Sequence, residues 1–438
     1  MTLLRARFKT VDRGIESRWE RHVQAMGLIT PSTVVISAGS LVTEAMMRVL
    51  LTANPQSGHW HPLVPFAEAL RAAGHEVAFA NTPVACAAIS ALGFPCFPAG
   101  ADETAEDGQA RRERQATHPG TDVSAASANL FAGVWAERRL PDLRAICAAW
   151  QPTILVRENL EFTGCIAAES QGLPHAVVQV TAWRPWFHPR LVAPLNRLRR
   201  RVGLPPDPDL SMLYRYLLLS PVPTSYQDPS APLPPTAYAV RHVVFDRSGQ
   251  ESLPTWVGEL PDRPVVYATM GTAFNRVGSI LETIVAGLRD EPITLVVTTG
   301  RDQDPAAFGP QPSHVHLERY VPQSLLFPRC DLVVTHGGTG TVLTALNHGL
   351  PLVIVPVFSD QPDNARRCEQ LGVAKVIAPD DRTPEAFRDA VRKVLGDPRY
   401  RRNAERLREE MAQLPGPEQV VGWLERLAAK KQPLVASP

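Results

Sequence analysis

Residues 331–362 read DLVVTHGGTGTVLTALNHGLPLVIVPVFSDQP and contain the clearest structural pattern in the chain. Leu332–Thr335 is an apolar, β-branched run typical of a buried parallel strand. His336 follows, with three glycines in the next four positions, which allow a sharp turn and a close approach to a ligand. A helix is expected over Val342–His348 and a second strand over Leu352–Val355. The stretch therefore predicts one strand–turn–helix–strand unit of a parallel α/β sheet.

The turn has the chemistry of an anion site. N–H groups at a helix start point outward, and the helix dipole places roughly half a positive charge there. His336, Thr339 and Thr341 add donors suited to a diphosphate. The glycine pattern alone fits equally well a turn that only packs a helix on a strand. Asp360 and Gln361 favour binding, because polar groups that follow neighbouring parallel strands converge on one crevice.

Two segments together resemble a known family. HGGTGT (336–341) followed by PVFSDQPDN (356–364) is similar to the donor-sugar signature of family 1 glycosyltransferases, especially the bacterial enzymes that glycosylate macrolides and other natural products. The resemblance extends from about Met47 to the C-terminus. It implies an α/β protein of the GT-B fold, with two Rossmann-like domains that face each other across a cleft, acting in natural-product or antibiotic biosynthesis.

Length and composition set outer limits. A chain of 438 residues is too long for one core, so two domains are expected. The net charge of +1 and the absence of a long basic block argue against nucleic acid as a partner. No apolar stretch is long enough to predict a transmembrane segment. The six cysteines show no CxxC spacing, which predicts reduced thiols in a cytoplasmic protein, with no disulfide and no zinc site.

The chain divides into three predicted parts. We expect residues 1–46 to be an N-terminal extension that is poorly ordered. Residues 47–240 form an N-terminal acceptor-binding domain, and residues 241–438 form a C-terminal nucleotide-sugar domain. The proline-rich stretch Gln227–Arg263 is interpreted as the interdomain linker. The resemblance implies that the final helix, Gly416–Lys430, packs back on the N-terminal domain.

The resemblance assigns the catalytic base to His59, in the loop after the first strand. A neutral imidazole suits removal of a hydroxyl proton while the new bond forms. His61 is the competing candidate, and both histidines also fit simple loop or cap positions. Glu158, which follows the predicted strand Thr153–Arg157, is the candidate carboxylate that orients His59, although the family more commonly has aspartate there. Glu161 is a weaker alternative.

The donor site is assigned by the same resemblance. The leaving diphosphate would be stabilised by His336, Gly338, Gly340, Thr341 and Thr272, without a metal ion. Asp360 and Gln361 would bind sugar hydroxyls. Tyr320 would stack on the nucleobase, Val321 would read its edge, and Gln323 completes this segment, although the family often has tryptophan where Tyr320 stands. An apolar wall for the acceptor is expected from Trp135, Trp183, Trp186 and Phe187, which equally fit core positions.

The predicted function is an inverting, metal-independent glycosyltransferase. It would move a sugar from a UDP- or dTDP-sugar co-substrate to a hydroxyl of a hydrophobic small molecule, with no other cofactor. A homodimer or a helper protein stays open. Two alternatives remain: a metal-dependent hydrolase that uses His59 and His61 as ligands, and a non-catalytic partner protein that only binds nucleotide sugars.

Overall fold

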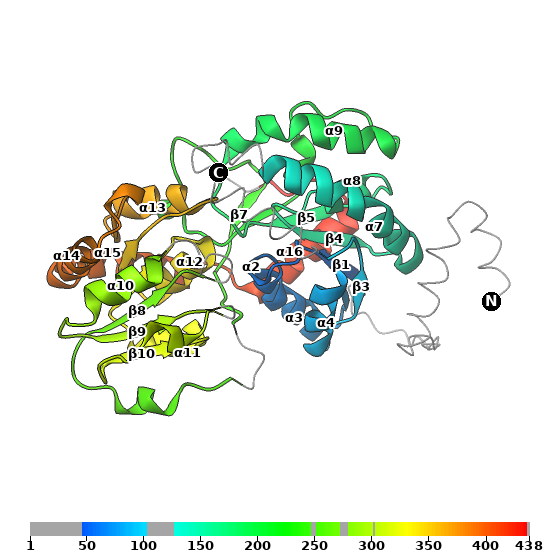
Figure 1. Ribbon diagram of the computed structural model, residues 1–438. Helices are drawn as coiled ribbons and strands as arrows, with labels where there is room; N and C mark the ends of the chain where they lie inside the picture. The colour runs from blue at the N-terminus through cyan, green and yellow to red at the C-terminus, as the bar shows by residue number, and fades with distance from the viewer. Residues whose placement is uncertain (1–45, 103–126, 247–250, 272–278, 301–302, 436–438) are drawn as a thin grey trace. The chain divides into compact units, whose positions relative to one another are not determined.

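The computed structural model describes residues 46–102, 127–246, 251–271, 279–300 and 303–435. Within these ranges two parallel sheets form the frame, each covered by helices (Figure 1). The predicted N-terminal extension, apart from Met46, lies outside the described residues. Within the described part of the chain, no helix combines the length and apolarity needed to cross a bilayer.

The first sheet is built around β1 (Arg48–Thr52), which pairs in parallel with β2 and with β4. The strand order is β3-β2-β1-β4-β5-β6-β7. The remaining strands are β2 (Glu76–Asn81), β3 (Cys96–Pro98), β4 (Ile154–Glu158), β5 (His175–Val178), β6 (Leu218–Ser220) and β7 (Ala237–Ala239). The helical segments between its described strands are α2 (Ser57–Trp60), η1 (His61–Leu63), α3 (Val64–Ala72), α4 (Pro83–Ala91), η2 (Asn129–Trp135), α7 (Ala136–Trp150), α8 (Thr163–Glu169), η3 (Pro185–Arg190), α9 (Val192–Arg201), η4 (Ser211–Leu213) and η5 (Thr224–Tyr226).

The second sheet repeats this plan, with β8 (Val265–Thr269) paired to β9 and to β11 (Leu332–Thr335). Its order is β10-β9-β8-β11-β12-β13. The other strands are β9 (Thr294–Thr298), β10 (Val315–Glu318), β12 (Leu352–Ile354) and β13 (Ala374–Val376). Its described α-helices are α10 (Ile280–Leu288), α11 (Gln323–Leu326), α12 (Thr339–Asn347), α13 (Gln361–Gln370), α14 (Pro384–Gly396) and α15 (Pro398–Ala412). Short 3-10 segments are η6 (Thr255–Glu259), η7 (Pro305–Phe308), η8 (Phe327–Arg329) and η9 (Pro379–Asp381).

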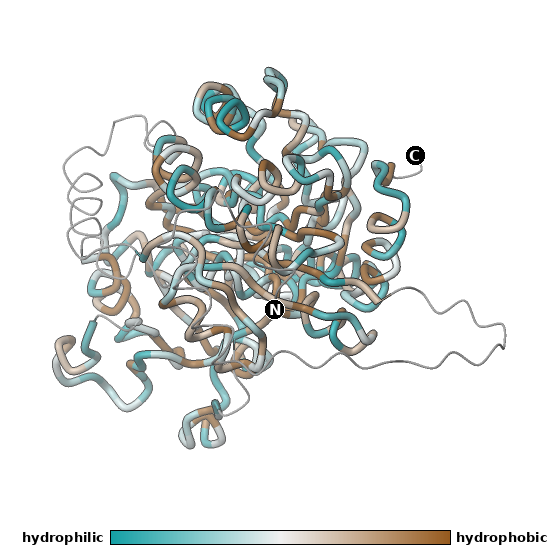
Figure 2. The backbone as a smooth tube through the Cα atoms, turned by 90° about the vertical axis from the view of Figure 1, so that its right-hand side faces the viewer, coloured by the Kyte–Doolittle hydropathy of each residue, from teal (hydrophilic) through white to brown (hydrophobic). Residues whose placement is uncertain are grey.

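Apolar strands bury both faces of each sheet, as expected when helices cover both sides. Residues of β11 show the pattern, because Leu332 and Val334 belong to one core cluster and Val333 to the cluster on the opposite face. Figure 2 shows hydrophobic residues recurring between hydrophilic ones along the helices, which suits helices that bury a single face. The strand–turn–helix–strand unit predicted from residues 331–362 is thus present as β11, α12 and β12.

Helix α16 (Pro417–Lys430) belongs to the core of the first sheet, although it follows the second sheet in sequence. Val420, Leu424 and Leu427 of α16 share a core cluster with Val49 and Leu51 of β1. In Figure 1 the red helix α16 lies beside β1 and α3. The chain therefore returns to its first core after completing the second sheet.

The predicted linker contains more structure than its proline content suggested. Ala237–Ala239 forms β7, the edge strand of the first sheet, paired with β6. An edge position tolerates the nearby prolines, because one side of the strand needs no ladder partner. The domain boundary placed at residue 240 stays a prediction.

Two cysteines depart from the prediction of reduced thiols. Cys86, near the start of α4, forms a disulfide with Cys96 at the start of β3, with their Cα atoms 5.2 Å apart. The prediction is wrong for this pair because the α4–β3 connection folds back within ten residues, which a search for CxxC spacing does not detect. The other four cysteines are buried and free: Cys147, Cys165, Cys330 and Cys368.

Candidate active site

His59 lies on α2, immediately after β1, where the main chain turns away from the sheet. Its Nδ1 atom is 3.0 Å from Oε1 of Glu158, the last residue of the neighbouring strand β4. The Glu158 side chain is fully buried, whereas the His59 side chain is 17% exposed. An ionised carboxylate only accepts hydrogen bonds, so Nδ1 is the donor in this contact. The pair has the geometry of an imidazole oriented by a carboxylate.

The Glu158 carboxylate is held by further donors. The Leu160 backbone N–H donates to Oε2 at 2.6 Å, and the Asn54 side-chain amide donates to Oε1 at 2.7 Å. A buried carboxylate requires such partners to offset its lost hydration. The extra methylene of glutamate, compared with the aspartate that the resemblance led us to expect, does not prevent contact with His59.

The weaker alternative, Glu161, is occupied elsewhere. Its carboxylate accepts from the backbone N–H groups of Thr163 and Gly164 at the start of α8, at 2.8 and 2.9 Å. The Thr52 hydroxyl donates to it at 2.7 Å. These contacts give Glu161 the role of a helix cap that ties α8 to β1.

His61 has a different environment from His59. Its ring packs edge-on against Trp60, with centroids 4.1 Å apart, and against Phe245, at 5.3 Å. Across the described residues, no group of three or more His, Cys, Asp and Glu side chains is placed to hold a metal ion.

His336 follows β11 and occupies a slot between two glycines. A Cβ added at Gly271 would lie 2.6 Å from its Cε1, and one at Gly338 would lie 2.6 Å from its Nε2. Gly271 also has φ +71°, a conformation that other residues rarely adopt. Burial lowers the pKa of His336 to about 4, opposed by the nearby Asp360 charge. The imidazole is therefore neutral at pH 7, a hydrogen-bonding group that brings no full charge of its own.

Helix α12 begins beside this ring. Gly338 is its N-cap in an extended conformation, and no side chain caps the helix at that residue. The first helical bond joins Val342 N–H to Gly338 O, so the N–H groups of Gly340 and Thr341 precede the helical ladder. The partial positive charge of a helix start is thus available next to His336. Thr272, also predicted to face the diphosphate, lies outside the described residues.

Asp360 and Gln361 are both buried and both hydrogen-bonded within the protein. Asp360 Oδ2 accepts from the Thr339 hydroxyl at 2.6 Å and from the Ala182 backbone N–H at 3.1 Å. Gln361 Oε1 accepts from the backbone N–H groups of residues 357 and 358, each at 2.8 Å. Between them and the strand, Ser359 has φ 63°, a strained conformation of the kind found at binding loops.

The predicted nucleobase segment connects β10 to α11. The Tyr320 side chain is 53% exposed, and its hydroxyl donates to the backbone carbonyl of Asp246. Val321 is buried in the core of the second sheet. The Gln323 amide lies 3.5 Å from the Thr341 hydroxyl, which places the start of α11 next to the start of α12.

The residues predicted to form an acceptor wall have different ring partners. Trp135 packs edge-on against Phe131 with centroids 5.0 Å apart, and Phe131 lies 6.1 Å from the His59 ring. Trp183 instead packs against Tyr214, at 4.9 Å. Phe131 was missed by sequence reasoning, although its i, i+4 spacing to Trp135 is a signal that both share one helical face.

The other two predicted aromatic residues have contrasting exposure. Trp186 is 46% exposed, and with Trp183 it lines a cavity of about 50 Å³ that also contacts Thr339 and Asn364. Phe187 is only 4% exposed, so it is a core residue in this structure and the prediction that it faces the acceptor is not supported.

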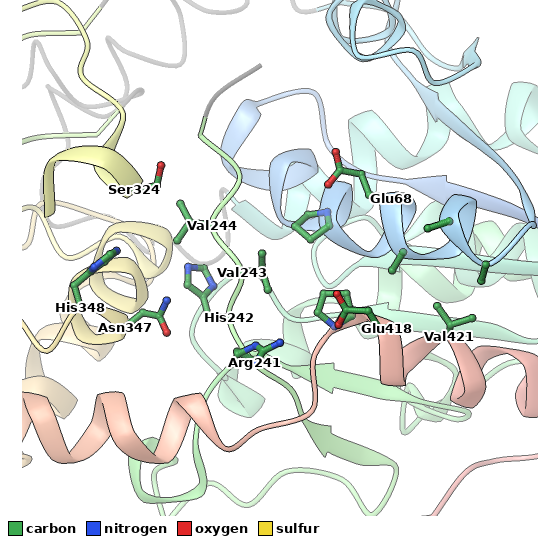
Figure 3. Close-up of a pocket in the computed structure, with 15 residues that line it drawn as sticks. Glu68, Arg241, His242, Val243, Val244, Ser324, Asn347, His348, Glu418 and Val421 are labelled. Atoms are coloured by element: carbon green, nitrogen blue, oxygen red, sulfur yellow. The ribbon is translucent and has the colours of Figure 1, made fainter. Parts of the chain in front are cut away.

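A larger cavity, of about 810 Å³, contains none of the predicted site residues. Figure 3 shows His242, Asn347 and His348 on one side and Glu68 and Glu418 on the other. Burial lowers the pKa of His242 to about 4. Neither His59 nor His336 is among the residues that line this cavity.

The chain matches two family models described as erythromycin biosynthesis protein CIII-like. The N-terminal model matches residues 68–207, and the C-terminal model matches residues 285–427. The N-terminal model falls within the half that contains the first sheet. The C-terminal model covers most of the half that contains the second sheet and extends into α16.

Comparison with individual proteins gives consistent results. The chain is 31% identical over 428 residues to 10-deoxymethynolide desosaminyltransferase of Streptomyces venezuelae, covering 88% of this chain and 98% of the relative. It is also 31% identical to tylactone mycaminosyltransferase of Streptomyces fradiae, covering 87% and 93%. Among solved structures, the glycosyltransferase VinC in complex with dTDP is 28% identical, with a TM-score of 0.74 and coverage of 88% of this chain and 100% of VinC.

Proposed function

The chain belongs to the GT-B glycosyltransferases of natural-product biosynthesis, and from this premise we propose that it is an inverting, metal-independent enzyme that glycosylates a hydroxyl of an apolar small molecule. Membership in this family supports a nucleotide-sugar-dependent glycosyltransferase over the hydrolase and over the non-catalytic partner. The observation that carries the proposal is the hydrogen bond between His59 and the buried Glu158.

In the proposed reaction His59 is the base. Its Nε2 takes the proton of the acceptor hydroxyl while the acceptor oxygen forms a bond to the anomeric carbon of the sugar. The bond from that carbon to the diphosphate oxygen breaks, and its electron pair leaves with the diphosphate. Glu158 stabilises the resulting imidazolium at 3.0 Å. Attack from the face opposite the leaving group converts an α-linked donor into a β-linked product.

The departing diphosphate would be received by His336 and by the start of α12. The helix start supplies N–H groups and a partial positive charge, and the neutral His336 imidazole supplies a hydrogen bond. These groups act on the negative charge as it develops, which is the task that a metal ion performs in other transferases. We propose that no metal is needed for this step.

For the donor we propose a dTDP-sugar in preference to a UDP-sugar. The relative VinC was solved in complex with dTDP, which supports this choice. The exposed Tyr320 ring would stack on the pyrimidine. Asp360 and Gln361 would bind sugar hydroxyls through the side-chain atoms that their contacts within the protein leave available. Phe131, whose ring lies near that of His59, and Trp135, which packs on Phe131, would contact the acceptor.

The test is a panel of dTDP- and UDP-sugars against polyphenol, macrolide and steroid acceptors in the presence of excess EDTA. We expect dTDP to be released only when donor and acceptor are both present, and a β-linked product by NMR from an α-linked donor. Loss of turnover in EDTA with recovery on adding Mg²⁺ would contradict metal independence. An α-linked product would contradict inversion.

A further inference from the structure

Asn54 contacts the same carboxylate oxygen as His59. It follows β1, is 2% exposed, and places Nδ2 2.7 Å from Oε1 of Glu158, with its backbone N–H at 3.4 Å from that oxygen. The His59 ring reaches this oxygen at 3.0 Å. Parallel pairing of Thr52 with Arg157 brings the two strand ends together and sets up this contact.

The orientation of the Asn54 amide is fixed from behind by Arg139. The guanidinium Nη1 lies 3.4 Å from Asn54 Oδ1, and Arg139 is only 3% exposed. A guanidinium has donors and no acceptor, so the amide oxygen must face Arg139 and the amide NH₂ must face Glu158. Arg139 is itself held by Glu161, at 3.5 Å.

We propose that Asn54 is a positioning residue of the transferase reaction, which holds the Glu158 carboxylate in the orientation that aligns His59. With Leu160 N–H on Oε2 and Asn54 on Oε1, each oxygen of the carboxylate has a fixed donor. Removal of the Asn54 side chain leaves Oε1 with only the imidazole and the weaker backbone N–H contact at 3.4 Å, so this end of the carboxylate, and the imidazole bonded to it, are held less firmly. The inference rests on the proposed role of His59 as the base.

The direct test is Asn54→Ala in the full-length protein. We expect kcat to fall roughly tenfold to 100-fold, because small misplacements of a reacting group have effects of this size. The KM for donor and acceptor and the Kd for dTDP should stay at wild-type values, since Asn54 is buried and its side chain is hydrogen-bonded to Glu158 and Arg139. Asn81→Ala is the matched control: Asn81 is also buried at a strand end, but its amide oxygen accepts from Thr82 N–H.

A second measurement separates positioning from a structural role. In a Glu158→Ala background, adding Asn54→Ala should change kcat by less than about twofold, because the carboxylate on which Asn54 acts is gone. An equal loss in both backgrounds would overturn the inference, as would a kcat of Asn54→Ala equal to that of Asn81→Ala. If Asn54→Ala does not fold, Asn54→Ser takes its place, because serine is polar but too short to reach Glu158.

The role of His59 as the base is tested by a separate variant, His59→Ala. If His59→Ala keeps wild-type kcat, the proposed base is wrong. If His59→Ala is inactive while Asn54→Ala matches its control, only the role of Asn54 is wrong.

Discussion

The two halves of the molecule each place a histidine directly after a parallel strand or its first turn, but they hold it differently. His59 is hydrogen-bonded to a fully buried carboxylate and is partly exposed. His336 is wedged between Gly271 and Gly338, and burial lowers its pKa to about 4. The first environment gives the ring a carboxylate partner, and the second favours a neutral ring. This contrast is what the proposed roles require, a base in one half and a hydrogen-bond donor to the diphosphate in the other.

The largest expected effect separates the two histidines by kinetics. His59→Ala should lower kcat by about 10³-fold, since a general base contributes 10²–10⁴-fold, and should leave the Kd for dTDP unchanged. Product formation followed by mass spectrometry and calorimetry with dTDP measure the two quantities. His61→Ala is the control and should retain most of the activity, because its ring packs against Trp60 and Phe245. A dTDP affinity that falls in parallel with kcat would show that the halves are not separable in this way.

The next effect concerns stability in acid. The folded-state pKa of His336 is about 4, below the value of about 6.5 in an unfolded chain. Between these pH values the unfolded state binds a proton that the folded state does not, so the free energy of unfolding falls as pH falls from 6.5 to 4. In His336→Gln that loss should be smaller by about 2–3 kcal/mol. Urea unfolding at several pH values measures it.

The control for this pH series is Gly396→Ala, whose added methyl group meets nothing within 4 Å. It should keep the wild-type dependence of stability on pH. A His336→Gln variant with an unchanged dependence would mean that His336 is accessible to protons in the folded protein, and the contrast with His59 would disappear.

The smallest effect tests the glycine slot. Gly338→Ala places a Cβ 2.6 Å from Nε2 of His336, so the ring must move. We expect the affinity for dTDP to fall about tenfold, equivalent to about 1.4 kcal/mol, while the affinity for thymidine, which lacks phosphates, is retained. Calorimetric titration with both ligands checks this, with Gly396→Ala again as the control. Equal losses for dTDP and thymidine would place the effect on the nucleoside and not on the phosphates.

Much of the fold could be predicted because its signals are local. Leu332–Thr335 is a strand with the predicted limits, and the helix predicted over Val342–His348 begins three residues earlier as α12. Thr339 and Gly340 have weak helical preference, so the sequence does not mark them as helical. They form the first turn of α12 because tertiary contacts, such as the hydrogen bond from the Thr339 hydroxyl to Asp360, outweigh that preference. β7 was missed because three residues of edge strand among prolines carry almost no pattern.

The site was less predictable because its contacts join residues that lie far apart in the sequence, such as His59 and Glu158. His59 and Glu158 were selected by resemblance and by their positions after neighbouring strands, and the structure brings them into contact. Asn54 carries no comparable signal, because an asparagine after a strand is common, and the spacing of Phe131 to Trp135 indicates a shared helical face without linking it to His59. Their importance depends on side-chain directions that only the folded chain defines. The aromatic residues that follow Trp183 show the same limit. Trp186 is 46% exposed and Phe187 is 4% exposed, a difference that the sequence does not indicate.

Helix α16 has a consequence for how the protein is made. The interior that surrounds β1 includes Leu424 and Leu427, which leave the ribosome long after β1 does. During synthesis the apolar face of the first half that α16 will cover therefore stays exposed until the second half has been translated. A nonsense or frameshift mutation just before Pro417 would remove α16 and leave this apolar face permanently exposed, although the second sheet could still form. We therefore expect the truncated protein to be degraded as misfolded and not to accumulate.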